Sequence, residues 1–138
     1  MVNQSGKPII MKRFISILIF LYLSQLFSQQ KILVSNISDY NSAIKKAKSG
    51  DKIILKNGVW KNIKLEAYGK GTKEKPITIR AEKPGKVILT GNSTLKIYGE
   101  YIIVQGLWFK DGNPTSKSIV SFRKNSKLFA NNGRIFHN

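Results

Sequence analysis

Short apolar segments recur along residues 49–111, and this repetition constrains the fold more than any other feature of the chain. Gly, Asn, Pro or Lys separates each segment from the next. A segment this short cannot bury an apolar face by itself, so it must stack on its neighbours. The pattern therefore predicts an all-β fold, a right-handed single-stranded parallel β-helix. The segments are IIL at 53–55, ITI at 77–79, VIL at 87–89, LKI at 95–97 and YIIVQGLWF at 101–109.

A short amphipathic cap helix is expected just before these segments. Its apolar positions recur at the helical spacing i, i+3, i+4 and i+7. Ser38 or Asp39 can serve as the N-cap, and Gly50 can end the helix in a left-handed conformation. Such a helix covers the apolar end of the first coil, which water would otherwise contact. The apolar positions are Tyr40, Ala43, Ile44 and Ala47.

Strands are expected on both sides of this helix. Residues 31–35 form a first apolar run, and after the helix the apolar spacing changes to two, which is the strand period. The longest strand is expected at 101–109, with Ile103, Gln105 and Leu107 on one face. Beyond it lie an expected excursion at 113–117 and further strands at 118–122, 127–130 and 134–138.

The segment 1–28 predicts export. Lys12 and Arg13 precede an apolar run at 14–27, after which the sequence becomes polar. A basic start, a short apolar stretch and a small residue at Ser28 are typical of a secretory signal peptide. The run is shorter than the roughly 20 apolar residues that a membrane-spanning helix needs.

Cleavage at this point leaves residues 29–138 as one domain, which we expect to be secreted or periplasmic and free of the membrane. Translation can also start at Met11, and a retained N-terminal anchor is the alternative to cleavage. A lipoprotein is excluded because the chain has no Cys to acylate. A solenoid normally ends in a cap, and none follows the last strands. We therefore expect the N-terminal part of a longer β-helix, with about four coils of about 25 residues.

The chain is strongly basic, with a net charge of +17. Such a charge indicates an acidic partner, although the lysines can also serve only to keep the domain soluble. Removal of the first 28 residues takes away Lys7, Lys12 and Arg13 but no acidic residue, so the domain stays basic. Export argues against nucleic acid, and the expected partner is an anionic polysaccharide. Lysines that contribute to this field, or form solvated faces, lie at 45, 46, 48, 52, 56, 61 and 64.

Several motifs, in their order and spacing, resemble the N-terminal region of the polysaccharide lyases that include chondroitinase B and the alginate lyases of the same family. The resemblance covers nearly all of the mature chain. It implies a parallel β-helix that cleaves uronic-acid polymers, of the alginate or chondroitin and dermatan type, by β-elimination. The motifs are SGD at 49–51, NGVW at 57–60, GT at 71–72, KPITIRAE at 75–82, GKVILTG at 85–91, VQGLWF at 104–109 and ANNGRIFHN at 130–138.

The same resemblance implies a catalytic apparatus of a Lys base, an Arg partner and, in several members, a calcium ion held by Asn and Glu. In the family these residues lie on central coils beyond the matched stretch. No catalytic residue, metal ligand or cofactor is therefore assigned to this chain, and calcium is left to the full-length enzyme. We expect that full-length enzyme to be a monomer.

The candidate substrate-binding cluster lies in the last predicted coils, nearest the place where the family's cleft would begin. Its cationic and amide side chains suit the carboxylates and hydroxyls of an acidic sugar chain. For Asn131 and Asn132 the alternative is structural, a stacked Asn ladder in the turns of a β-helix. The cluster consists of Arg123, Lys124, Asn131, Asn132 and Arg134.

Other polar and aromatic residues carry weaker signals. His137 is the only histidine, and a lone His near a chain end is more often a turn or strand residue than a general base. Asp51 and Asp111 stand beside Gly, where they commonly form turns. Trp108 lies in the most apolar run and is expected in the core or in the stacking between coils. Aromatic residues able to stack on sugar rings are Trp60, Tyr68, Tyr98, Tyr101 and Trp108.

Three functions remain open at this point. The chain is the N-terminal part of a secreted polysaccharide lyase, a non-catalytic β-helix module that binds acidic glycans or belongs to a surface adhesin, or part of a pectate-lyase-like enzyme. Later coils that carry a Lys, an Arg, an Asn and paired Glu residues would favour the lyase over the binding module.

Overall fold

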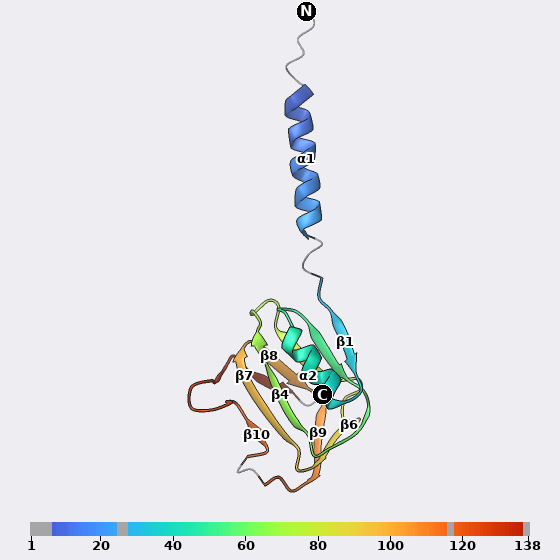
Figure 1. The fold of residues 1–138 in the computed structure, drawn as a ribbon, viewed down its shortest axis with the longest axis vertical. Helices are drawn as coiled ribbons and strands as arrows, with labels where there is room; N and C mark the ends of the chain where they lie inside the picture. The colour runs from blue at the N-terminus through green and yellow to red at the C-terminus, as the bar shows by residue number, and fades with distance from the viewer. Residues whose placement is uncertain (1–6, 25–27, 116–117, 137–138) are drawn as a thin grey trace, which may run out of the picture.

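The computed structural model describes residues 7–24, 28–115 and 118–136. Helix α1 (Lys7–Ser24) stands apart from the strands, which gather into one body with helix α2 (Figure 1). The apolar side chains of α1 between Ile9 and Ile19 are more than half exposed. Neither described helix is long and apolar enough to cross a membrane. His137 lies outside the described residues.

The strands form three parallel sheets, named A, B and C. Sheet A contains, in order, β1 (Lys31–Val34), β2 (Lys52–Leu55), β5 (Ile77–Ala81), β8 (Ile102–Gln105) and β12 (Arg134–Phe136). Sheet B contains β3 (Gly58–Lys61), β6 (Val87–Gly91) and β9 (Leu107–Gly112). Sheet C contains β7 (Thr94–Glu100) and its partners β4 (Lys64–Lys70), β10 (Val120–Ser121) and β11 (Ala130–Asn131).

The chain visits sheets A, B and C in turn, and each circuit is one coil. Lys52 lies beside Thr78, and Thr78 lies beside Ile103, so a coil is close to the predicted length. All pairings between named strands are parallel, which confirms the predicted parallel β-helix. Such crossovers between parallel strands are right-handed because the strands themselves twist to the right.

Buried side chains from all three sheets meet inside the coils. The register places an apolar residue of one coil directly over an apolar residue of the next. These stacks pack together and exclude water from the interior. The stacks are Ile53, Ile79 and Val104 in sheet A, Trp60, Leu89 and Phe109 in sheet B, and Leu65, Leu95 and Val120 in sheet C. The apolar runs recognised in the sequence therefore build the core.

Helix α2 (Ile37–Lys46) packs against β1, β2 and β4, as the cap prediction required. The predicted caps were wrong. The N-cap is Asn36, whose side chain accepts from the Asp39 N–H at 2.9 Å, and the helix ends before Gly50, with Ala47 as its C-cap. Tyr40 is fully buried and donates its hydroxyl to the Glu66 carbonyl at 2.9 Å, which fixes the helix to sheet C.

The expected long strand at 101–109 is two strands in different sheets. Gly106, at φ +73°, turns the chain from β8 into β9. Ile103 and Gln105 therefore face outward while Leu107 packs against the core, so the three residues do not share a face. Trp108 is not in the core, although it does stack between coils, in register with Ile88 of the preceding coil. The Trp108 side chain is 45% exposed on the outer face of sheet B, because the turn reverses which residues face inward.

Gly69 and Gly99 stack where two coils approach most closely. Gly99 has φ +92°, and a Cβ there would lie 2.2 Å from the Gly69 carbonyl oxygen. Gly99→Ala is therefore expected to lower the free energy of unfolding by about 3 kcal/mol, from backbone strain and a clash with rigid backbone. Urea denaturation measures this.

Gly85→Ala is the matched control. Gly85 also has positive φ, at +71°, but a Cβ there meets nothing within 4 Å. Gly85→Ala is expected to lower the free energy of unfolding by only about 1 kcal/mol, because a residue with a Cβ is strained in the left-handed conformation. Equal losses for the two variants would show that the close approach of the coils does not limit stability.

Candidate functional site

A row of residues crosses the outer face of sheet A, one from each coil, although Thr78 in its middle is only 8% exposed. Adjacent members are register partners, so they are separated by about 4.8 Å, the spacing of neighbouring strands. Three of the five are cationic and none is acidic. We call this set the basic row: Lys31, Lys52, Thr78, Ile103 and Arg134.

The charges of the basic row are not balanced within the described part of the chain. Lys31 and Lys52 lie directly opposite one another, an arrangement that is destabilising for like charges. The ion pairs found among the described residues involve Lys110 and Lys124, and neither belongs to the row. An anion lying along sheet A would relieve this repulsion.

A hollow of about 230 Å³ opens at the Arg134 end of the basic row. It combines two cationic side chains, an aromatic ring and an amide, which together suit an acidic sugar. We call it the Arg134 hollow. Its lining residues are Lys73, Pro76, Tyr101, Ile103, Asn132 and Arg134.

The backbone of Tyr101 is strained at this hollow. Its φ is +50°, a conformation that costs a residue other than Gly about 1–3 kcal/mol. The coils on either side hold it there: the Tyr101 N–H donates to the Asn131 carbonyl at 2.9 Å, and its carbonyl accepts from the Ile77 N–H at 3.1 Å. Gly71 occupies the same corner, where a Cβ would lie 2.7 Å from the Tyr101 carbonyl oxygen. Backbone strain of this kind concentrates at functional sites.

The predicted binding cluster divides between two places. Asn132 and Arg134 line the Arg134 hollow, and Asn131 adjoins them, since its Oδ1 accepts from Asn132 Nδ2 at 3.0 Å. Arg123 and Lys124 lie instead on the 122–129 loop, which connects β10 to β11 beside sheet C. The structure therefore brings together three of the five predicted residues.

Lys124 is held on sheet C by Glu66 and Tyr98. Its Nζ lies 3.5 Å from Glu66 Oε2 and 5.3 Å from the centre of the Tyr98 ring. The Tyr98 hydroxyl donates to Glu66 Oε2 at 2.7 Å, and the Tyr98 ring stacks on Tyr68 with centroids 5.1 Å apart. Burial and the bond to Glu66 raise the pKa of Tyr98, so its hydroxyl stays a donor. Lys124 therefore fixes the loop, and its side chain is still 44% exposed, so its predicted contact with substrate stays a prediction.

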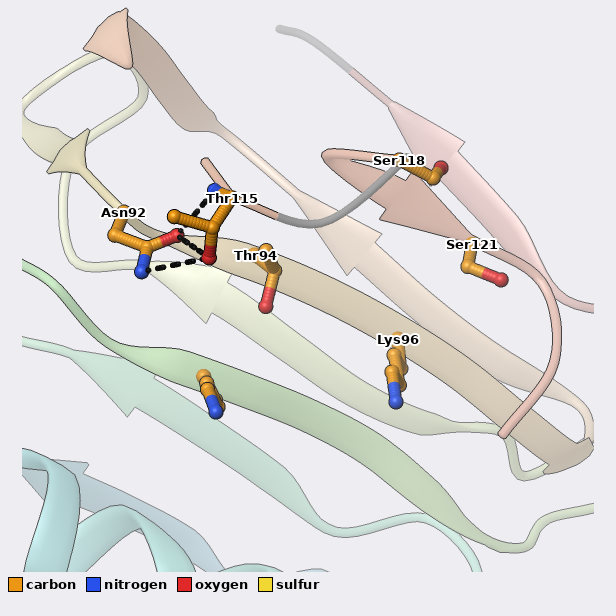
Figure 2. Close-up of a pocket in the computed structure, with 7 residues that line it drawn as sticks. Asn92, Thr94, Lys96, Thr115, Ser118 and Ser121 are labelled. Carbon is orange, nitrogen blue, oxygen red and sulfur yellow. Dashed lines mark hydrogen bonds between the residues drawn. The ribbon is translucent and has the colours of Figure 1, made fainter. Parts of the chain in front are cut away.

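An asparagine ladder is present, but at the turn between sheets B and C and not at Asn131 and Asn132. The Asn62 side chain accepts from the Asn92 N–H at 2.9 Å. Asn92 Oδ1 in turn accepts from the Thr115 N–H at 2.9 Å, one coil further on, as Figure 2 shows. Asn62 has φ +57°, which Asn tolerates.

The sequence reasoning missed Lys31 and Lys73, and it treated Lys52 only as part of a general field. The missing signal was the coil register, since the basic row appears only when residues one coil apart are aligned. The Asp51 carboxylate is structural, as expected, and accepts from the N–H groups of Gln30 at 3.0 Å and Lys48 at 2.8 Å. Among residues 7–24, 28–115 and 118–136, no three Asp, Glu, His or Cys side chains gather to hold a metal ion.

Three solved structures are similar to this chain. The alginate lyase AlyGC of polysaccharide lyase family 6 is 45% identical with a TM-score of 0.74, over 76% of this chain and 14% of AlyGC. A mannuronic-acid-specific family 6 lyase from human gut microbiota is 29% identical with a TM-score of 0.69, over 78% of this chain and 25% of the lyase. A family 6 lyase from Pseudopedobacter saltans is 37% identical with a TM-score of 0.64, over 75% of this chain and 24% of that lyase.

The chain thus spans a quarter or less of the length of these relatives. No match was found among curated proteins. The sequence model of the family described as Chondroitinase B matches residues 34–138, which include every strand after β1 as well as helix α2. By this match and by its similarity to the family 6 alginate lyases, the chain belongs to the chondroitinase B family of polysaccharide lyases.

Proposed function

We propose that the chain forms the N-terminal coils of a secreted lyase that cleaves a uronic-acid polysaccharide, of the alginate or the chondroitin and dermatan type, by β-elimination. The observation that carries this proposal is the similarity of nearly the whole β-helix to the alginate lyase AlyGC.

In the proposed reaction, a base removes the proton at C5 of a uronate, the C4–C5 double bond forms, and the oxygen at C4 leaves and takes up a proton. The C5 proton is poorly acidic until a cation neutralises the neighbouring carboxylate. We assign the base and this cation to later coils. A calcium ion, in an enzyme of this family that uses one, would also be held there.

The role that we assign to these coils is binding of the polyanion. The basic row places cationic side chains along the axis of the β-helix, and the Arg134 hollow follows at its end. A row of positive charge concentrates an anionic chain by long-range attraction and holds it across successive coils. An extracellular or periplasmic polysaccharide is the partner that fits this surface and an exported protein.

Export is part of the proposal. The exposed apolar side chains of α1 pack on no part of the coils, which suits a segment that functions before folding and is then removed as a signal peptide. The alternative function is a non-catalytic module that binds acidic glycans. It can also belong to a surface adhesin, and the basic row alone would serve such a module.

Lyase activity is tested with the full-length product of the gene. Incubation with alginate or dermatan sulfate is expected to raise the ultraviolet absorbance of the unsaturated uronate that β-elimination creates. Binding of either polymer without any rise in absorbance would favour the non-catalytic module, and the absence of both would contradict the proposal.

The basic row is tested by Lys52→Gln together with Arg134→Gln. Loss of two charge-assisted contacts is expected to weaken binding to alginate about tenfold or more. Added salt screens these contacts and is expected to narrow the difference in affinity between the variant and the unchanged protein. Affinity electrophoresis in alginate gels measures this. Lys45→Gln is the matched control, since it removes an exposed charge from α2 and leaves sheet A unchanged. Equal losses for the control would mean that only net charge matters.

Tyr101 is tested by Tyr101→Asn, because Asn tolerates positive φ and lacks the ring. The free energy of unfolding is expected to stay within about 1 kcal/mol, since relief of strain offsets lost ring contacts. Alginate binding is expected to weaken severalfold. A variant that unfolds more easily but binds equally well would make Tyr101 a structural residue alone.

A further inference from the structure

A second hollow, of about 370 Å³, lies on the outer face of sheet C (Figure 2). Strands β4 and β7 supply its floor, and Thr115, Ser118 and Ser121 of the next coil flank it. We call it the Lys96 hollow. Its lining residues are Lys64, Asn92, Thr94, Lys96, Thr115, Ser118 and Ser121.

Two positive charges enter this hollow without a negative charge to balance them. Lys64 lies opposite Thr94, and the register partners of Lys96 are Glu66 and Ser121. Glu66 is the acidic residue nearest in register, but its Oε2 already pairs with Lys124 Nζ at 3.5 Å. No ion pair of Lys64 or Lys96 is found in the described part of the chain.

The same Glu66 oxygen also accepts the Tyr98 hydroxyl at 2.7 Å. Lys124 and Tyr98 thus neutralise and hold the carboxylate that would otherwise attract Lys96. The hollow is left with the two lysines as its charged groups, because all its other lining side chains are neutral.

The remaining lining groups are hydroxyls and one amide, the usual partners of sugar hydroxyls. Asn92 and Thr115 are oriented before any ligand binds: Asn92 Oδ1 accepts from the Thr115 N–H at 2.9 Å, and Asn92 Nδ2 donates to Thr115 Oγ1 at 3.3 Å. Figure 2 shows Thr94 and Lys96 side by side along β7, with Ser121 across from them. A site ordered in advance loses less entropy on binding.

The Lys96 hollow is separate from the Arg134 hollow. Thr94, at the start of β7, lines the first, and Tyr101, which follows the end of the same strand, lines the second. Lys96 also lines the first hollow, and it lies five positions before Tyr101, about 16 Å along an extended strand. One sugar residue cannot contact both, so each hollow needs its own ligand group.

We propose that the Lys96 hollow is a second binding site for the anionic polysaccharide, in which Lys64 and Lys96 bind the carboxylate or sulfate of one sugar residue. Asn92, Thr94 and Thr115 contact the hydroxyls of that residue. This inference rests on the proposed function, since it takes the same polymer as ligand. It adds a holding site on sheet C, away from the basic row on sheet A.

Lysine acetylation followed by mass spectrometry tests the site residue by residue. The full-length product is acetylated briefly with and without a mannuronate oligomer, which carries only carboxylates. At an oligomer concentration ten times the dissociation constant, acetylation of Lys64 and Lys96 is expected to slow about tenfold. Lys45 on α2 is the internal control and is expected to react at an unchanged rate.

A second arm uses a sulfated galactan oligomer without uronate. Protection by mannuronate alone identifies a carboxylate site, protection by the galactan alone identifies a sulfate site, and either result supports the inference. Lys64→Gln is expected to reduce the protection of Lys96 severalfold, because the two lysines share one anion. Full protection of Lys96 in that variant would contradict a shared site.

The same spectra separate failure of this inference from failure of the proposed function. Protection of Lys31 and Lys52 without Lys64 and Lys96 would leave the basic row as the binding surface and overturn the second site. Unchanged rates at all of these lysines with both oligomers would overturn both proposals.

Discussion

Parallel pairing between successive coils is the constraint on which the rest of the structure depends. No coil here can bury its apolar residues alone, and the core forms only because Ile53, Ile79 and Val104 stack in register. The same register fixes the outside of the sheets. Lys31 lies opposite Lys52 because Ile32 and Ile53 pair next to them. Burial of the core therefore offsets the repulsion between those lysines, and the basic row is a consequence of the fold.

The pairing between coils leaves little room for side chains at the corners between sheets. Coils approach so closely there that Gly99 has no room for a side chain. Two residues after Gly99 in the same coil, the turn from β7 to β8 places Tyr101 at positive φ beside the Arg134 hollow. The hydrogen bonds from the coils on both sides hold Tyr101 in this conformation. Rigid stacking thus makes strained residues tolerable at a surface hollow, where they can position a ring.

The apolar runs were enough to predict a parallel β-helix with a capping helix, because burial of short strands is decided by local composition. They were not enough to place its corners. Gly106 divides the run at 101–109, and this single turn exposes Trp108. The candidate site was predicted only in part for the same reason. Asn132 and Arg134 are near in sequence and line the same hollow, whereas Lys73 reaches that hollow only because the coils stack. Lys124 forms an ion pair with Glu66 of another coil.

The arrangement of the coils explains why much of the large positive charge is not balanced by ion pairs within the described residues. Few carboxylates are present, and some of them already bind groups within the protein. Asp51 accepts hydrogen bonds from backbone N–H groups, and Glu66 forms an ion pair with Lys124. Lys31 and Lys52 on sheet A, and Lys64 and Lys96 on sheet C, consequently have no ion pair within the described residues, and the two pairs lie on different sides of the coils. A compact ligand would satisfy only one such face. A long polyanion that bends around the β-helix could satisfy both, and a polysaccharide is a polymer of that kind.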